Sequence, residues 1–476
     1  MFERTALSRR KFLRAGILAG GATVLSVAAL AGCGEEESAT APAATKAAAT
    51  AAAPAATTAA VAAAAPKPAT GEVQFWDWWN PTSGVETKNW FDFLKTDFEA
   101  KNPSLKINFQ FVPFGNEYVQ KFQAASAAGN PPDIMHSSII WARDFFDLGT
   151  LEVLNDRIKT DPEMAMEKFL PGALFYNQKK GETYGIPMEG ADSRILIWDK
   201  KMLQEAGLDP SFESVWSWTW EKFAEAAMKL TKKTGDTLER SGYLVAIPSM
   251  EMLGTWLRTQ GIGFYNEEQT ALNLSKGQAK AAIQFELKLL NQDKVSMPLG
   301  AERQDFQQFL EGKTAMVSGG TWNIAAVRNG APGKDFDIGP YPQGPGGKGP
   351  GTTTWYNMIV MPVKGKNKDG AWVWAQYYGG LQSFKDRVRI MSRFAPRIAL
   401  YESEEFKKEA VKEPLLERVP KIAEVGGAYP FIRFTETNTI FTPAIESIYV
   451  KNSDIDKTLA EIEEQANPLL TKAGGT

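Results

Sequence analysis

The alternation of strand and helix patterns that begins at residue 73 constrains the fold of this chain more than any other feature. Residues 73–76 form a short apolar run, and large apolar side chains recur at helical spacing over 85–100. Apolar and polar residues then alternate over 105–111, which indicates a half-buried strand. A strand, a helix and a second strand in this order are typical of an α/β fold, which we expect here.

The same alternation continues towards the C-terminus. The patterns predict strands over 133–135 and 314–317, and helices over 117–127, 219–235 (capped by Thr219), 278–290 (opened by a capping box at Ser275), 302–310, 369–380 and 454–469. Residues 341–353 are rich in Pro and Gly, which predicts a long loop or a crossing between structural units. A chain of 476 residues is long enough for two or three such units.

Residues 1–32 have the layout of a bacterial secretory signal. Basic residues are concentrated in 9–14, and 15–31 carry no charged side chain. This apolar stretch is short and interrupted for a membrane span, so we expect it to be removed. Residues 8–13 resemble the twin-arginine export motif, although two arginines also fit an ordinary signal. Residues 30–33 resemble the lipobox of bacterial lipoproteins, which implies that Cys33 carries a lipid and becomes the first mature residue.

The segment that follows is almost entirely Ala, Thr, Ser and Pro. Such a composition buries too little apolar surface to offset the entropy of ordering, and its prolines interrupt any helix. We therefore expect residues 33–70 to consist of the lipidated Cys33 and a disordered tether.

Composition excludes several classes of function. The formal charge of −3 falls to about −7 when the signal is removed, and no basic stripe remains for nucleic acid. The chain contains one Cys and one His, so an intrachain disulfide and a zinc site of Cys and His ligands are both excluded. A metal site made of carboxylates stays open, but the sequence contains no loop like that of an EF-hand. We expect no cofactor and no metal.

Catalytic motifs are matched only superficially. Residues 344–349 satisfy the glycine spacing of a dinucleotide-binding loop but lack the helix that should follow. Residues 312–314 look like the end of a P-loop whose first glycine is missing, and His136 has no nucleophile elbow beside it. We therefore expect a protein that is not an enzyme, although a glycosidase with two catalytic carboxylates stays open.

Aromatic and polar residues gather where strands are expected to end. The carboxyl ends of strands in open α/β sheets are where ligands bind. An indole face stacks on the C–H face of a pyranose, while polar side chains hydrogen-bond its hydroxyls, so these segments suit a sugar. The alternative is that each tryptophan fills a core. The candidates from this pattern are Trp78, Trp79, Asn80, Ser138, Trp141, Asp144, Trp322 and Trp355.

Five stretches of the chain resemble the extracellular solute-binding proteins, family 1, which serve ATP-driven sugar importers. They are residues 124–135, 184–187, 198–203, 218–223 and 312–317. The resemblance implies a two-lobe periplasmic-binding-protein fold of type II, in which each lobe is a mixed sheet flanked by helices and the ligand lies in a cleft at the hinge. It places hinge crossings near 186–188, 315–316 and 353–354. Lobe 1 then comprises 71–187 with 316–353, and lobe 2 comprises 188–315 with 354–476.

The resemblance also suggests roles for single residues. Trp141 and Asp144 match the W-x-x-D segment that contacts sugar in maltose-binding relatives, and Trp322 matches their stacking aromatic. Asp192 falls where those relatives place an acidic sugar ligand. The neighbours Glu189 and Arg194 are further candidates, although Arg194 also suits an ion pair with either acid. Glu251 and Trp256 complete the set, with a buried helix as the alternative.

These features together predict a lipid-anchored binding component of a carbohydrate ABC importer. Its expected ligand is a mono- or oligosaccharide, and its expected partner is the transmembrane part of an ABC permease. We expect a monomer that binds no nucleic acid and is held by its N-terminal lipid at the outer face of the cell membrane, in the cell envelope or periplasm. A phosphorylated polyol, peptide or polyamine is the alternative ligand on the same fold.

Overall fold

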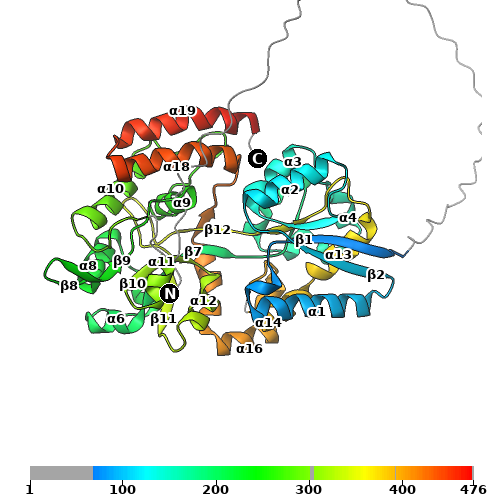
Figure 1. Ribbon diagram of the computed structural model, residues 1–476, viewed down its shortest axis with the longest axis horizontal. Helices are drawn as coiled ribbons and strands as arrows, with labels where there is room; N and C mark the ends of the chain where they lie inside the picture. The colour runs from blue at the N-terminus through cyan, green and yellow to red at the C-terminus, as the bar shows by residue number, and fades with distance from the viewer. Residues whose placement is uncertain (1–67, 301–304, 392, 474–476) are drawn as a thin grey trace, which may run out of the picture. The chain divides into compact units, whose positions relative to one another are not determined.

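Two β-sheets organise the residues that this computed structural model describes, which are 68–300, 305–391 and 393–473 (Figure 1). The first sheet has the order β2-β1-β3-β13-β6, and the second has the order β14-β12-β7-β10-β9-β8 with β11 also paired to β7. The predicted signal, lipobox and most of the tether lie outside the described residues.

The strands have the following bounds. The first sheet contains β1 (Gly71–Asp77), β2 (Leu105–Phe111), β3 (Ile134–Ser137), β6 (Ile186–Pro187) and β13 (Met358–Val360). The second contains β7 (Asp192–Asp199), β8 (Lys232–Thr234), β9 (Thr237–Tyr243), β10 (Thr314–Gly320), β11 (Phe336–Gly339), β12 (Thr352–Trp355) and β14 (Gly426–Ala428). A separate hairpin joins β4 (Gln178–Lys179) to β5 (Glu182–Thr183).

The β-α-β opening predicted from the sequence is confirmed. Strand β1 pairs in parallel with both β2 and β3, and parallel neighbours need a crossover such as a helix. Helix α1 (Val85–Lys101) and helix α2 (Asn116–Ala127) supply the two crossovers. The buried side chains of α1 are Trp90, Phe91, Leu94 and Phe98, at the predicted helical spacing.

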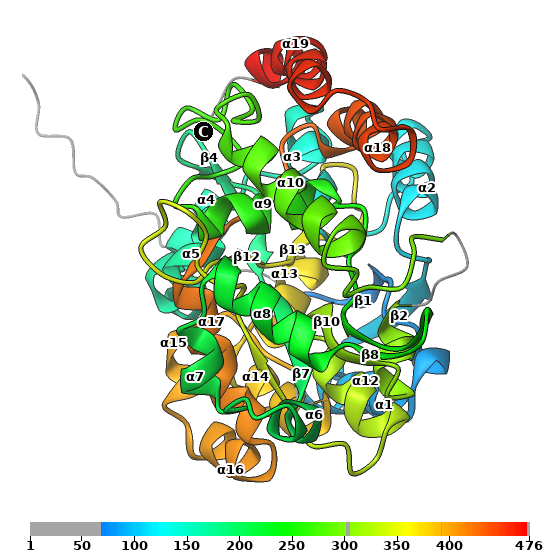
Figure 2. The ribbon, with the colours of Figure 1, turned by 90° about the vertical axis from the view of Figure 1, so that its left-hand side faces the viewer.

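Helices cover the second sheet on the side that Figure 2 presents. There α8 (Trp220–Leu230) packs on β9 and β10, α9 (Met250–Thr259) packs on β12, and α10 (Gln278–Asn291) packs on α9. The other helices are α3 (Ile139–Asp147), α4 (Asn155–Lys159), α5 (Pro171–Leu174), α6 (Lys200–Glu205), α7 (Phe212–Trp216), α11 (Asp305–Leu310), α12 (Asn323–Gly330), α13 (Lys368–Tyr378), α14 (Leu381–Met391), α15 (Ile398–Tyr401), α16 (Glu404–Lys412), α17 (Arg418–Glu424), α18 (Phe434–Lys451) and α19 (Ile455–Ala473). In the described part of the chain, none of the helices combines the length and the apolar character that crossing a membrane requires.

Two helix predictions need correction. The helix capped by Thr219 ends at Leu230 rather than at 235, because a β8–β9 hairpin follows it. The capping box at Ser275 does not form: Gly277, with a φ of 89°, precedes α10, and no side chain caps that helix. The backbone N–H of Ser275 instead donates to Glu463 of α19.

The sheet topology contradicts much of the predicted division of the chain into lobes. The chain leaves the first sheet at β6 and enters the second at β7, which agrees with a crossing near 186–188. Residues 316–353 do not belong to the first lobe, because β10 and β11 pair with β7 and β12 also joins it. The second crossing therefore lies between β12 and β13, and the predicted crossing near 315–316 is wrong.

Residues after the second crossing also divide differently from the prediction. Helix α13 packs on β1 and α14 packs on α1, so both belong to the first lobe. The chain then returns to the second lobe, where α17 packs against β7 and β12. The assignment of all of 354–476 to the second lobe is therefore wrong.

Candidate functional site

A cavity of about 550 Å³ lies where the crossings between the two sheets meet. Small-molecule sites typically have this size and combine aromatic side chains with a few polar groups. The residues that line it are Trp78, Trp79, Phe114, Ser138, Ile139, Ile140, Glu189, Asp192, Arg194, Glu251, Trp322, Trp355, Asn357, Arg393, Tyr429 and Phe434.

The first lobe contributes the residues that follow β1 and β3. Because these strands are parallel neighbours, their carboxyl ends meet at one edge of the sheet. Trp78 and Trp79 follow β1 directly, and the Trp78 ring stacks on the His136 ring with centroids 3.5 Å apart. Ser138 caps α3, where its hydroxyl accepts from the backbone N–H of Ile140 at 3.5 Å.

Three aromatic rings form the second lobe's part of the wall. The ring centroids of Trp322 and Trp355 are 5.4 Å apart, and those of Trp355 and Tyr429 are 5.0 Å apart. All three side chains are half-buried, so part of each ring is open. The Trp322 ring folds back over Gly320, where a Cβ atom would lie only 2.1 Å from it. A glycine at the end of β10 therefore lets the indole take this position.

One ion pair neutralises the second lobe's charges in the wall. Arg194 donates to both carboxylate oxygens of Glu251, at 2.8 and 2.6 Å, which is the strong bidentate geometry. Glu251 in turn raises the pKa of Arg194, although burial opposes this, and the guanidinium lies 5.5 Å from the Trp322 ring. Arg194 thus forms the ion pair left open by the sequence, but with Glu251 rather than with Glu189 or Asp192.

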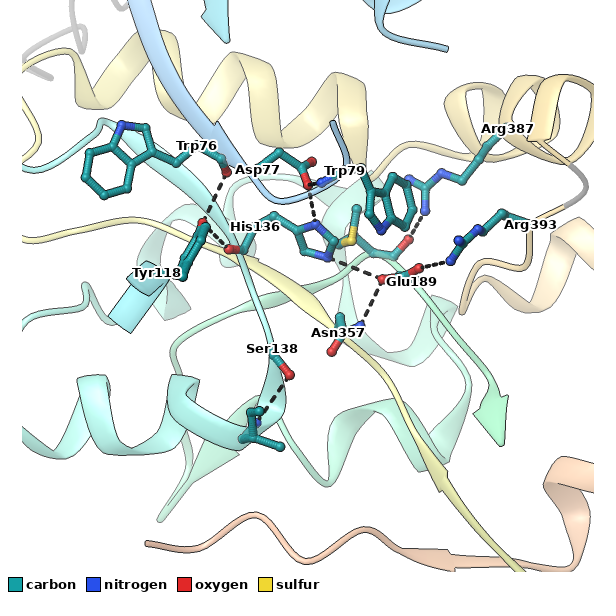
Figure 3. Close-up of polar contacts among 12 residues, drawn as sticks. Trp76, Asp77, Trp79, Tyr118, His136, Ser138, Glu189, Asn357, Arg387 and Arg393 are labelled. Atoms are coloured by element: carbon teal, nitrogen blue, oxygen red, sulfur yellow. Dashed lines mark hydrogen bonds and ion pairs between the residues drawn. The ribbon is translucent and has the colours of Figure 1, made fainter. Parts of the chain in front are cut away.

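Two further carboxyl groups lie between the lobes with opposite pKa shifts. Glu189 accepts from Arg393 and Asn357, each at 2.8 Å (Figure 3). Burial opposes ionisation, but His136, Arg393 and Asn357 together lower the pKa of Glu189 to about 2. Asp192 accepts from the Thr321 hydroxyl at 3.0 Å, and burial and the charge of Glu189 raise its pKa to about 7.

Comparison with known proteins identifies the family. Residues 81–380 match the family described as bacterial extracellular solute-binding protein. This chain belongs to that family.

Among curated relatives of this solute-binding protein is a putative binding protein of Brucella abortus. The two are 23% identical over 404 residues, which cover 82% of this chain and 91% of the relative. The resemblance on which the fold was predicted is thereby confirmed.

Solved structures share the two-lobe fold. The GacH receptor of Streptomyces glaucescens, determined unliganded and with acarbose, has a TM-score of 0.70 at 22% identity, covering 84% of this chain and 99% of its own. UgpB of Mycobacterium tuberculosis, in complex with glycerophosphocholine, has a TM-score of 0.70 at 17% identity, and the match covers 85% of this chain and 99% of UgpB. At these identities the likeness establishes the fold and not the ligand.

Nine of the thirteen candidate ligand residues lie in the cavity wall of this solute-binding protein. They are Trp78, Trp79, Ser138, Glu189, Asp192, Arg194, Glu251, Trp322 and Trp355. Whether they contact a ligand stays a prediction.

The other four candidates do not line the cavity. Asn80 is exposed and accepts from the backbone N–H of Thr82. Trp141 is buried behind the wall, where its ring lies edge-on to Trp78. Asp144 lies on α3, where burial and the charge of Glu436 raise its pKa to about 7. Trp256 is fully buried in α9, which agrees with the buried-helix alternative for its segment.

Seven lining residues were missed by sequence reasoning. They are Phe114, Ile139, Ile140, Asn357, Arg393, Tyr429 and Phe434. Asn357 lies two residues after Trp355, so the pattern of polar and aromatic residues at strand ends could have identified it. Arg393 and Tyr429 reach the cavity from far along the chain, after α14 and β14, and carry no local signal.

Among the described residues, no group of three or more His, Cys, Asp or Glu side chains is arranged to hold a metal ion.

Proposed function

We propose that this solute-binding protein captures a neutral carbohydrate in the cavity between its lobes and delivers it to an ABC permease. In this proposal a lipid on Cys33 holds the protein at the outer face of the cell membrane, and no covalent chemistry occurs. The ligand is a mono- or oligosaccharide, and the protein works as a monomer.

The observation that carries the proposal is a wall of aromatic faces in which both arginines are already paired with a glutamate. Arg194 is satisfied by Glu251, and Arg393 by Glu189. An anionic ligand would have to break these pairs to reach an arginine, whereas a neutral polyol needs only ring faces and hydrogen-bonding groups. Trp355 supplies a face, and Asp192 supplies a carboxyl group for hydroxyls.

Capture follows from hinge closure. The chain crosses between the lobes at β6–β7 and again at β12–β13, so the two sheets are joined by short segments. A ligand that contacts both lobes binds the closed arrangement more tightly than the open one and shifts the population towards it. The closed form is the one that docks on the permease.

A thermal-shift and calorimetric panel tests the ligand class. We expect neutral mono- or oligosaccharides to raise the melting temperature of the purified protein, and saturation at a hundred times Kd to add about 2.7 kcal/mol. The panel includes glycerophosphocholine, a peptide and spermidine. Stabilisation by one of these alone, weakening with salt, would overturn the sugar assignment. Release of reducing sugar from an oligosaccharide would establish a glycosidase instead.

Variants locate the binding. Trp355→Ala removes an open ring face and should weaken binding of a panel sugar by about 2 kcal/mol, roughly 30-fold, as measured by calorimetry. The matched control is Trp216→Ala, because Trp216 is a half-buried tryptophan of α7 that does not line the cavity. Equal losses in the two variants would contradict a stacking role for Trp355.

A further inference from the structure

His136, the one histidine of the chain, lies directly behind the cavity wall and is fully buried in β3. Its ring stands between two carboxylates from different parts of the fold (Figure 3). Nδ1 is 2.9 Å from Oδ1 of Asp77 at the end of β1, and Nε2 is 3.4 Å from Oε2 of Glu189 in the first crossing.

This arrangement fits a charged ring better than a neutral one. A neutral imidazole has one N–H, so it donates to Asp77 or to Glu189 and turns a lone pair towards the other carboxylate. The imidazolium donates to both. In agreement, the two carboxylates raise the pKa of His136 above 6.5, although burial alone would lower it.

Charged neighbours surround the network, but the His136 ring is the group that contacts both Asp77 and Glu189. Arg393 pairs with Oε1 of Glu189, the oxygen that His136 does not face. Arg387 of α14 donates to the backbone carbonyl of Met188 (Figure 3), and its charge acts on both carboxylates. The remaining titratable groups facing this network are Asp192 at the start of β7, Tyr118 of α2 and Tyr378 of α13.

The ring is also coupled to the cavity itself. The Trp78 indole stacks on it with an interplanar angle of 22°, and a cation held against an indole face is attracted to it. Glu189 faces the Nε2 atom of the ring, and its carboxylate accepts a hydrogen bond from the side-chain N–H of Asn357. Trp78, Glu189 and Asn357 all line the cavity, whereas His136 does not.

We propose that His136 is a positioning residue of the binding cavity: its charged ring ties the end of β1 to the first crossing and thereby holds Trp78 and Glu189 in place. This inference rests on the proposed function in one respect, which is that the cavity is the site where the ligand binds. When the ring loses its proton, one carboxylate loses its donor, and the crossing that carries Glu189 is released from the first sheet. The arrangement of the two lobes then depends on pH even without ligand.

The first measurement is the titration of the ring. Since the chain has one histidine, NMR of the full protein with isotope-labelled histidine gives a single imidazole signal. We expect its midpoint above pH 6.5. In Glu189→Gln the amide donates to a neutral Nε2 while Nδ1–H still donates to Asp77, so the midpoint should fall. Tyr118→Phe is the control, because its hydroxyl donates to the backbone carbonyl of His136 and not to the ring.

The second measurement is the distance between the lobes. The chain's one cysteine is removed by Cys33→Ser, and spin labels are attached at Asn89→Cys on α1 and Met228→Cys on α8, both exposed positions. We expect the distance distribution to change across the ring's midpoint and that change to move to lower pH in Glu189→Gln. The proposal is overturned if the ring is neutral at pH 6.5, or if the distribution does not follow the midpoint in both proteins. Neither readout needs a ligand, so failure of the sugar panel and failure of this inference are distinct results.

Discussion

At the scale of the residue, Glu286 is a buried acid that the binding cavity does not use. It lies on α10 with 1% of its surface exposed, and it accepts from the Tyr449 hydroxyl at 2.9 Å. Burial raises its pKa to about 8, although Tyr449 and Trp256 oppose this with hydrogen bonds. The folded protein therefore holds a proton at neutral pH that the unfolded chain releases.

This proton makes stability depend on pH in a definite direction. Between pH 4.5 and 8 the folded state binds more protons at Glu286 than the unfolded state does, so the free energy of unfolding falls as pH rises. Glu286→Gln should remove this loss of stability, which is on the order of 5 kcal/mol at most. Denaturant melts of both proteins at pH 5 and pH 9 check it. We expect the free energy of unfolding to fall less from pH 5 to pH 9 in the variant than in the parent. An equal fall in the two proteins would contradict the prediction.

Single residues of the cavity were predictable where a local pattern marked them. Asp192 and Trp322 stand at motif positions, and Trp78 follows a strand that periodicity identifies. Trp141 shares that strand-end signal but turns behind the wall, because the same pattern serves core and surface rings. Arg393 has no local signal, since only the return of α14 to the first lobe brings it to Glu189.

At the scale of the element, two helix starts in the second lobe form a matched test of capping. The Thr219 hydroxyl accepts from the backbone N–H of Lys222 at 3.3 Å, whereas Ser275 does not cap α10. We expect Thr219→Ala to lower the free energy of unfolding by about 1 kcal/mol and Ser275→Ala to leave it nearly unchanged. Chemical denaturation of the two variants measures both values. Equal losses would mean that the cap at Thr219 contributes nothing of its own.

Element boundaries failed where a glycine or a tertiary partner decides them. Ser275 and Gln278 have the capping-box spacing, but Gly277 takes a left-handed conformation between them and breaks it. Strand β10 runs on to Gly320, beyond the predicted end at 317, because Ser318, Gly319 and Gly320 continue the antiparallel ladder with β7. Small residues carry little strand propensity of their own, so this extension depends on the neighbour.

At the scale of the whole molecule, α/β class and two lobes were predictable, but the path of the chain between them was not. Periodicity identifies β10 as a strand without saying which sheet it joins, and it does not mark β12 as a strand at all. Their pairing with β7 is a long-range choice, as is the packing of α13 on β1. The first crossing was predictable because a motif marks it.

The proposed anchor also acts on the whole molecule, and a single substitution tests it. Two acyl chains on Cys33 would bind the membrane stably, and a tether of the length of 33–70 would hold the folded part about 35 Å away on average. Cys33→Ser should move the protein from the membrane fraction to the soluble fraction of cells. Its melting temperature should not change, because position 33 lies outside the compact unit that Lys67–Thr476 form. Ala43→Ser, which introduces the same residue into the tether, is the control and should stay with the membrane. A Cys33→Ser protein that remains in the membrane fraction would show that something other than this lipid holds it there.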